Sequence, residues 1–223
     1  MADLIRGLDA ERVRAAAQAV RDEIAAACAE VGRDPAEVEL LAAVKYVAVE
    51  ELPVLAAAGL TVLGENRAQE LERKAAAWEG AGLGPVTWDF IGHLQSRKVK
   101  TVAPLVRRIH SLGSDSALRE LGKLDGPVEV LVEVNIAGEE GKSGIAPRDL
   151  PAFLERCPVP VTGLMTMPPL AAEAEQNRPW FAALAALAAD HGLRELSMGT
   201  TQDFAVAVQE GATVVRVGTR LYS

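Results

Sequence analysis

The sequence predicts an α/β fold, a single (β/α)8 TIM barrel with an extra N-terminal helix. Short apolar runs alternate with longer, Ala-rich helix-like segments, a pattern typical of a parallel sheet. The alternation repeats eight times within 223 residues, a length that suits one barrel. The alternative, an open doubly wound sheet, normally uses fewer strands, and no GxGxxG motif follows the first strand here. We therefore expect residues 1–223 to form one domain.

Compact apolar runs predict the strands, since strands buried on both faces lose the apolar–polar alternation. The run at 128–134 is the clearest of them. The predicted strands are 38–44, 60–63, 86–91, 108–111, 128–134, 161–165, 195–197 and 214–217.

Apolar residues at helical spacing predict the helices, and glycines end several of them. Gly32, Gly59, Gly192 and Gly211 stand at such ends. The predicted helices are 8–31, 49–58, 66–78, 95–102, 115–123, 147–155, 173–190 and 202–210, of which the first precedes the barrel.

The net charge of −8 argues against binding to nucleic acid or to an anionic membrane surface. The N-terminal residues contain no apolar signal-peptide core, and no apolar run reaches transmembrane length, so we expect a cytoplasmic protein. Cys28 and Cys157 lack a CxxC partner or a nearby histidine, which argues against a metal site.

Functional residues of such barrels lie where the strands end at their carboxyl side. Lys45 follows the first predicted strand and would point into the barrel mouth. In general, burial lowers the pKa of an ammonium group, and a neutral amine can attack an aldehyde. A lone lysine at this position would more often reach out to solvent.

The last two strands end in residues suited to an anion. Arg216, Gly218 and Thr219 follow one another at the end of the eighth strand, where a glycine allows close approach of the backbone. Ser197 and Thr201 stand at the preceding strand-to-helix turn. These residues predict a phosphate-binding site, although Ser and Thr here could simply cap the next helix.

Closure of the barrel would make the first and eighth strands neighbours. A ligand with an aldehyde and a phosphate would then span the lysine and the anion site. Pyridoxal 5′-phosphate (PLP) is such a ligand.

Six sequence stretches, in order along nearly the whole chain, make the resemblance to a known family specific. They are AAVKYV (42–47), LGENRAQE (63–70), WDFIGHLQSRKVK (88–100), VEVNIAGEEGKSGI (132–145), GLMTMPP (163–169) and LSMGTTQDFAVAVQEGATVVRVGT (196–219). In these stretches the chain resembles the YggS/PROSC family of pyridoxal phosphate homeostasis proteins. The resemblance implies a fold-type III PLP barrel, like that of alanine racemase but without its second β-domain.

The resemblance also implies roles for individual residues. Lys45 would be the Schiff-base lysine, Asn66 would line the pocket, Ile91 would pack near the ring face, and Arg216 would lie against the pyridine nitrogen. Ser197, Thr201, Gly218 and Thr219 would hold the phosphate, and the choice between Ser197 and Thr201 as the main hydroxyl stays open.

The chain departs from the family pattern at three places. Thr200 and Thr201 replace the more usual Met-Ser, Arg97 stands where Asn is common, and Asp89 stands where His is common. None of these changes removes an implied PLP contact.

Arg216 bears on the mechanism that the resemblance implies. A charged guanidinium beside the pyridine nitrogen disfavours its protonation and makes the ring a poorer electron sink. We expect Tyr46, next to Lys45, to point away from the pocket. We therefore predict a non-catalytic protein that carries PLP as an aldimine on Lys45 in vitamin B6 homeostasis.

Two alternatives remain at this stage. One is a fold-type III racemase or decarboxylase, and the other is a barrel enzyme acting on a sugar phosphate. The expected partners are PLP and PLP-dependent apoenzymes, without nucleic acid, membrane or metal. The helices show no obvious apolar dimer stripe, so we expect a monomer.

Overall fold

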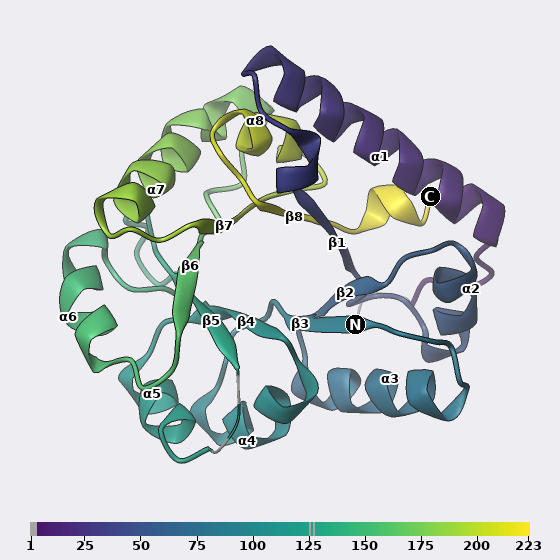
Figure 1. Ribbon diagram of the computed structural model, residues 1–223, viewed down its shortest axis with the longest axis horizontal. Helices are drawn as coiled ribbons and strands as arrows, with labels where there is room; N and C mark the ends of the chain where they lie inside the picture. The colour runs from purple at the N-terminus through teal and green to yellow at the C-terminus, as the bar shows by residue number, and fades with distance from the viewer. Residues whose placement is uncertain (1–3, 125, 127) are drawn as a thin grey trace.

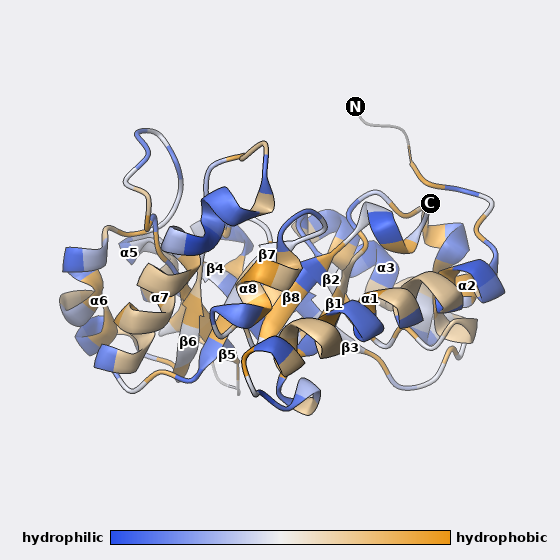
Figure 2. Ribbon diagram, turned by 90° about the horizontal axis from the view of Figure 1, so that it is seen from above, coloured by the Kyte–Doolittle hydropathy of each residue, from blue (hydrophilic) through white to orange (hydrophobic). Residues whose placement is uncertain are grey.

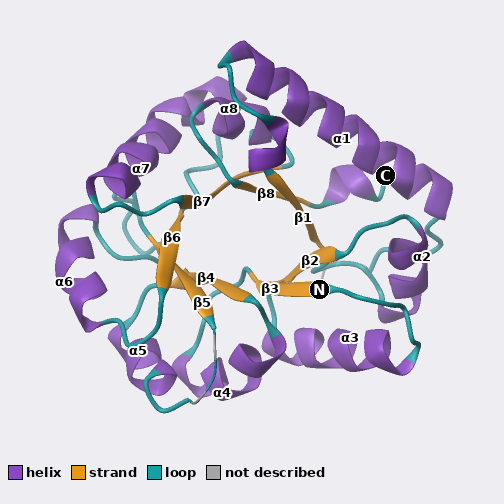
Figure 3. Ribbon diagram, in the orientation of Figure 1, coloured by secondary structure: helices purple, strands orange, loops and turns teal. Residues whose placement is uncertain are grey.

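Eight parallel strands close into a barrel surrounded by helices (Figures 1 and 3). The computed structural model describes residues 4–124, 126 and 128–223, so residues 1–3, 125 and 127 of the predicted domain lie outside the described part. Each strand pairs with the next in sequence, and β8 pairs with β1 to close the sheet. The predicted barrel with an extra N-terminal helix is confirmed.

All eight predicted strands are present. They are β1 Glu39–Ala43, β2 Val62–Glu65, β3 Thr87–Phe90, β4 Arg108–Leu112, β5 Glu129–Glu133, β6 Val161–Met165, β7 Glu195–Thr200 and β8 Val214–Val217. Two of them, β6 and β8, have the predicted bounds, and the others differ at their ends.

The predicted helices are present as well, several with a short 3₁₀ turn at one end. The α-helices are α1 Ala10–Glu30, α2 Leu52–Ala57, α3 Ala68–Gly80, α4 Val99–Val102, α5 Asp115–Leu121, α6 Leu150–Arg156, α7 Arg178–Asp190 and α8 Phe204–Gln209. The 3₁₀ segments are Pro35–Glu37, Val49–Glu51, Ser96–Lys98, Ala103–Leu105, Pro147–Asp149, Ala174–Asn177 and Thr219–Leu221.

Strand β7 extends three residues beyond its predicted end at Ser197. The sequence Gly199-Thr200 suggests a turn, and Gly199 does adopt a positive φ of 88°. The pairing with β8 nevertheless continues to Thr200, because the register shifts between Ser197 and Thr200 and absorbs the irregular backbone.

Helix α1 covers the outside of the barrel between α8 and α2 (Figure 1). Asp9 caps its N-terminus by accepting a hydrogen bond from the Arg12 N–H at 2.9 Å. Its buried face carries Val13, Ala17, Val20 and Ile24, which recur every three or four residues. This face supplies the apolar cover that the two short helices α2 and α8 leave incomplete.

The apolar strands lie in the middle of the molecule, and the hydrophilic stretches lie mainly on the loops and the outer helix turns (Figure 2). In the described part of the chain, no helix is both long and apolar enough to cross a membrane.

A fully buried ion pair joins α3 to the ends of β1 and β2. The Lys74 ammonium lies 2.6 Å from the Glu65 carboxylate and also donates to the Val44 carbonyl at 2.6 Å. The other oxygen of Glu65 accepts hydrogen bonds from the N–H groups of Asn66 and Arg67. The pair thus fixes the backbone immediately before Lys45 and around Asn66.

This buried pair predicts a large loss of stability in Lys74→Ala. The substitution leaves the Glu65 carboxylate buried without its cation, which should lower the free energy of unfolding by about 3–5 kcal/mol. Urea denaturation measures the loss. Lys123→Ala is the control, because the pair of Lys123 with Glu120 is exposed and should contribute less than about 1 kcal/mol. Equal losses in the two variants would contradict the prediction.

Candidate functional site

A cavity of about 510 Å³ opens at the carboxyl ends of the strands. Its walls come from residues at or just after the ends of β1 to β8, the position where barrels of this type place their functional groups. All predicted site residues except Ser197 line it, namely Lys45, Asn66, Ile91, Thr201, Arg216, Gly218 and Thr219.

Lys45 lies in the turn that follows β1 and is half-buried. Its carbonyl accepts a hydrogen bond from Arg67 at 3.1 Å, and the preceding carbonyl is held by Lys74. Within the described part of the chain, the Lys45 ammonium has no hydrogen bond or ion pair with protein groups. The residue therefore combines a fixed backbone with an amine that is available to a ligand.

The expectation that Tyr46 points away from the pocket is wrong. Tyr46 lines the cavity, and the centroid of its ring lies 5.1 Å from Lys45 Nζ. The strict alternation of a strand ends at Ala43, and both residues occupy a turn, so neighbouring side chains can reach the same space.

Asn66 and Ile91 form the wall next to Lys45. The Asn66 Oδ1 atom is buried and has no hydrogen-bond partner among the described residues. Gly92 lies against the Asn66 backbone so closely that any side chain there would overlap it. This glycine therefore sets the position of Asn66.

Thr201, Gly218 and Thr219 form what we call the β7–β8 rim. The Gly218 N–H donates to Thr201 Oγ1 at 3.1 Å, while Thr219 is exposed at the cavity mouth. Asp203 shapes the turn by accepting hydrogen bonds from the N–H and the hydroxyl of Thr200. The three residues of the rim thus provide hydroxyl and backbone N–H groups, and none of them is a carboxylate.

Ser197 lies deeper, inside the barrel, and is fully buried. Its hydroxyl is 2.8 Å from His110 Nδ1 and accepts a hydrogen bond from Arg216 at 2.5 Å. Its predicted contact with a phosphate stays a prediction, and its observed contacts are with two side chains of the barrel interior.

Arg216 reaches from β8 across the floor of the cavity. Nη1 donates to the carbonyl and the hydroxyl of Ser197, and Nη2 donates to the Thr166 carbonyl and contacts the Met167 sulfur. No described carboxylate pairs with it, and burial lowers the pKa of Arg216 to about 10. A guanidinium has five N–H donors, and these contacts leave the one on Nε without a partner in the described part of the chain.

Glu133 is a cavity residue that was not among the predicted site residues. Burial raises the pKa of its carboxyl, and Ser143 donates a hydrogen bond to it at 2.5 Å. The sequence contains a pattern that indicates this residue, because the charged Glu133 stands between two valines at the end of the clearest predicted strand. Of the histidines, His93 lines the cavity mouth, whereas His110 is buried in the barrel interior.

The chain is similar in sequence to proteins whose family is known. No family model matches the chain. A pyridoxal phosphate homeostasis protein of Aquifex aeolicus is 40% identical over 217 residues, which cover 91% of this chain and 94% of the relative. The protein of the same name from Pseudomonas aeruginosa is 39% identical over 223 residues, covering 96% of this chain and 91% of the relative.

Solved structures agree with these relatives. PipY of Synechococcus elongatus PCC7942 has been solved with PLP bound, and that structure matches this chain with a TM-score of 0.73 and 31% identity. The match covers 90% of this chain and 100% of PipY. Given this identity to the curated relatives over nearly the full length of both chains, the chain belongs to the family of pyridoxal phosphate homeostasis proteins.

Proposed function

We propose that this chain binds PLP in the cavity, attached through its aldehyde to Lys45, and serves in the homeostasis of PLP without catalysing a reaction of its own. One observation carries the proposal. The pairing of β1 with β8 brings the Lys45 amine, which has no partner among the described protein groups, and the β7–β8 rim to the same cavity. PLP carries an aldehyde and a phosphate arm on adjacent carbons of one ring, which match these two features of neighbouring strands.

The polar groups of the cavity fit this ligand. The β7–β8 rim offers two hydroxyl groups and the backbone N–H group of Thr219 to a phosphate, without a carboxylate to repel it, while the Gly218 N–H holds Thr201 Oγ1 in place. Asn66 lines the wall beside Lys45, where its side chain would face the ring. Arg216 offers one N–H that no described protein group accepts, which suits the lone pair of a pyridine nitrogen.

The position of Arg216 supports binding rather than catalysis. PLP supplies an electron sink when its pyridine nitrogen carries a proton, and enzymes commonly hold that proton with a carboxylate. Arg216 is a donor and remains charged near neutral pH, so it favours the unprotonated nitrogen. The chain's own residues would therefore hold the ligand while weakening its reactivity.

We further propose that the protein acts in the cytoplasm as a monomer and passes PLP to PLP-dependent apoenzymes. Its net charge of −8 suits a dissolved carrier. The large apolar side chains exposed in the described part are Leu4, Val31, Tyr46, Met167 and Leu170.

Attachment to Lys45 predicts a visible absorbance band in protein incubated with PLP and dialysed. Borohydride should fix the ligand on the peptide that contains Lys45, detectable by mass spectrometry. Lys45→Ala should lose both the band and the labelled peptide, whereas Lys123→Ala, which alters an exposed lysine outside the cavity, should keep them. The absence of this absorbance band in PLP-treated wild-type protein would contradict the proposal.

The β7–β8 rim predicts that Thr201, more than Ser197, holds the phosphate. Thr201→Val keeps the shape of the side chain and removes its hydroxyl. The inhibition constant of inorganic phosphate in competition with PLP should therefore rise roughly 10-fold. Ser197→Ala should change phosphate competition by less than about 2-fold, since its hydroxyl contacts other groups. A larger effect from Ser197→Ala would make Ser197 the phosphate ligand instead.

A non-catalytic role predicts slow exchange of amino-acid α-protons. PLP-loaded protein in deuterium oxide should exchange the α-protons of alanine, lysine and ornithine no faster than free PLP does, because Arg216 disfavours the protonated ring. Proton NMR measures the loss of each α-proton signal. Exchange at rates typical of enzymes would instead support the alternative, a fold-type III racemase or decarboxylase.

A further inference from the structure

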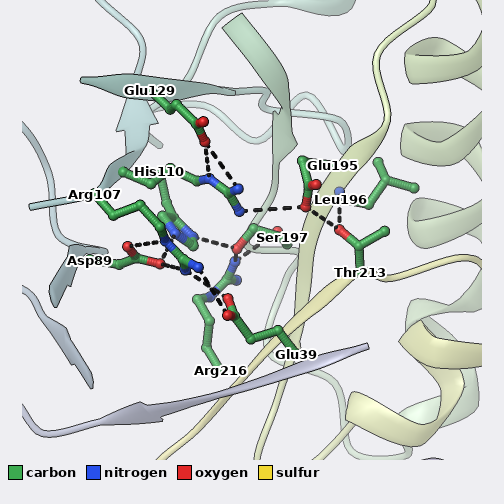
Figure 4. A network of polar contacts seen from close by, with 11 residues as sticks. Glu39, Asp89, Arg107, His110, Glu129, Glu195, Leu196, Ser197, Thr213 and Arg216 are labelled. Carbon is green, nitrogen blue, oxygen red and sulfur yellow. Dashed lines mark hydrogen bonds and ion pairs between the residues drawn. The ribbon is translucent and has the colours of Figure 1, made fainter. Parts of the chain in front are cut away.

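A continuous line of hydrogen bonds crosses the barrel interior directly below the cavity (Figure 4). Arg216 contacts Ser197, Ser197 contacts His110 Nδ1 at 2.8 Å, and His110 Nε2 contacts Asp89 at 3.1 Å. Arg107 holds the far side of Asp89 with two hydrogen bonds. We call these five residues the interior chain.

With Asp89 ionised and His110 neutral, only one arrangement of protons satisfies every contact in the interior chain. Burial alone would raise the pKa of Asp89, but hydrogen bonds from His110 and Arg107 outweigh it and hold that pKa below its ordinary value. An ionised Asp89 only accepts, so His110 must donate from Nε2. A neutral imidazole then accepts at Nδ1, and the Ser197 hydroxyl donates there.

When the Ser197 hydroxyl donates to His110, the lone pairs on its oxygen remain available to accept a hydrogen bond from Arg216. The guanidinium can only donate, so it needs an acceptor at this position. The opposite tautomer of His110 would donate from Nδ1 to Ser197. The hydroxyl would then receive two donors and would lose the acceptor for its own proton.

The charges around His110 favour the neutral ring. Burial lowers its pKa, and the cations Arg216 on β8 and Arg108 on β4 lower it further, against the opposing effect of Asp89 on β3. Arg107 also holds part of the Asp89 charge through its own ion pair. The neutral Nε2–H form therefore agrees with both the hydrogen bonds and the surrounding charges.

We propose that Asp89 and His110 are positioning residues, which fix the direction of the Ser197 hydroxyl and thereby hold the Arg216 guanidinium at the cavity floor. In this role Asp89 is the hydrogen-bond acceptor for His110 Nε2. The consequence for PLP rests on the function proposed above, whereas the tautomer of His110 does not.

Two substitutions of Asp89 distinguish the effect of its hydrogen-bond acceptor from the effect of its charge. Asp89→Ala removes the acceptor for His110 Nε2. Asp89→Asn also removes the charge but keeps one oxygen, and that oxygen can face both Arg107 and His110 at the position of Oδ2. Both variants remove the charge that pairs with Arg107, so a difference between them reports the oxygen that accepts from His110 and Arg107, and the tautomer of His110 shows its effect on the histidine.

Nitrogen-15 NMR of histidine-labelled protein gives a direct measurement, because the chain has only three histidines, His93, His110 and His191. Signals are assigned with His93→Gln and His191→Gln. We expect His110 to be the Nε2–H tautomer between about pH 6 and 8 in PLP-free wild type and in Asp89→Asn. Asp89→Ala should lose this tautomer as the dominant form.

PLP binding supplies the second measurement. Asp89→Ala should raise the Kd for PLP roughly 10-fold, because Arg216 loses its fixed orientation, while competition by inorganic phosphate at the β7–β8 rim stays within about 2-fold. Asp89→Asn should restore most of the PLP affinity. General unfolding would weaken PLP and phosphate together.

Three results would overturn the inference: wild-type His110 as the Nδ1–H tautomer, wild-type His110 titrating in this pH range, or equal behaviour of Asp89→Ala and Asp89→Asn. The first two need no substitution of Asp89 and no ligand, so they hold even if Asp89→Ala does not fold. A wild-type protein that binds no PLP would defeat the proposed function and leave the tautomer measurement unaffected.

Discussion

Closure of the sheet between β1 and β8 is the constraint on which the site depends. Residues 39–42 of β1 pair in register with residues 214–217 of β8. This register brings the turn with Lys45 and the turn with Gly218 to the same mouth, although they are far apart in the sequence. A shift of one residue would turn the side chain of Arg216 from the interior to the helix layer, so the cavity and its floor both require this register.

The interior that this closure creates is unusually polar for a packed core. Buried Asp89, His110, Ser197 and Arg216 occupy positions where barrels of this type commonly have branched apolar residues. Unpaired, such groups would be costly to bury, but each has partners in the interior chain. The polarity of the core and the placement of Arg216 therefore have one structural origin.

Periodicity and apolar runs were sufficient to predict every strand and the helices between the strands, because burial on both faces of a strand leaves a strong local signal. Strand ends were less predictable. Glu65 belongs to β2 although it is charged, since Lys74, nine residues later, neutralises it inside the core. That partner lies on another element, and local sequence does not indicate it.

The same distinction applies to the site. Residues at strand ends, such as Lys45 and Gly218, follow from topology and could be predicted. Side-chain direction beyond the last paired residue could not, which explains the error at Tyr46. The depth of Ser197 depends on its contacts with His110 and Arg216, which come from two other strands.

Asp89, His110, Ser197 and Arg216 are buried beneath the cavity and fill the barrel interior there, so we expect a ligand to reach the cavity through the mouth at the carboxyl ends of the strands. A ligand must then enter and leave by the same path, and both directions cross the same barrier. Anything that narrows this mouth slows uptake and release by the same factor and leaves the equilibrium occupancy unchanged. Residues at the entrance, such as Tyr46 and His93, are therefore suited to set how long the ligand stays, while the walls and floor set how tightly it binds.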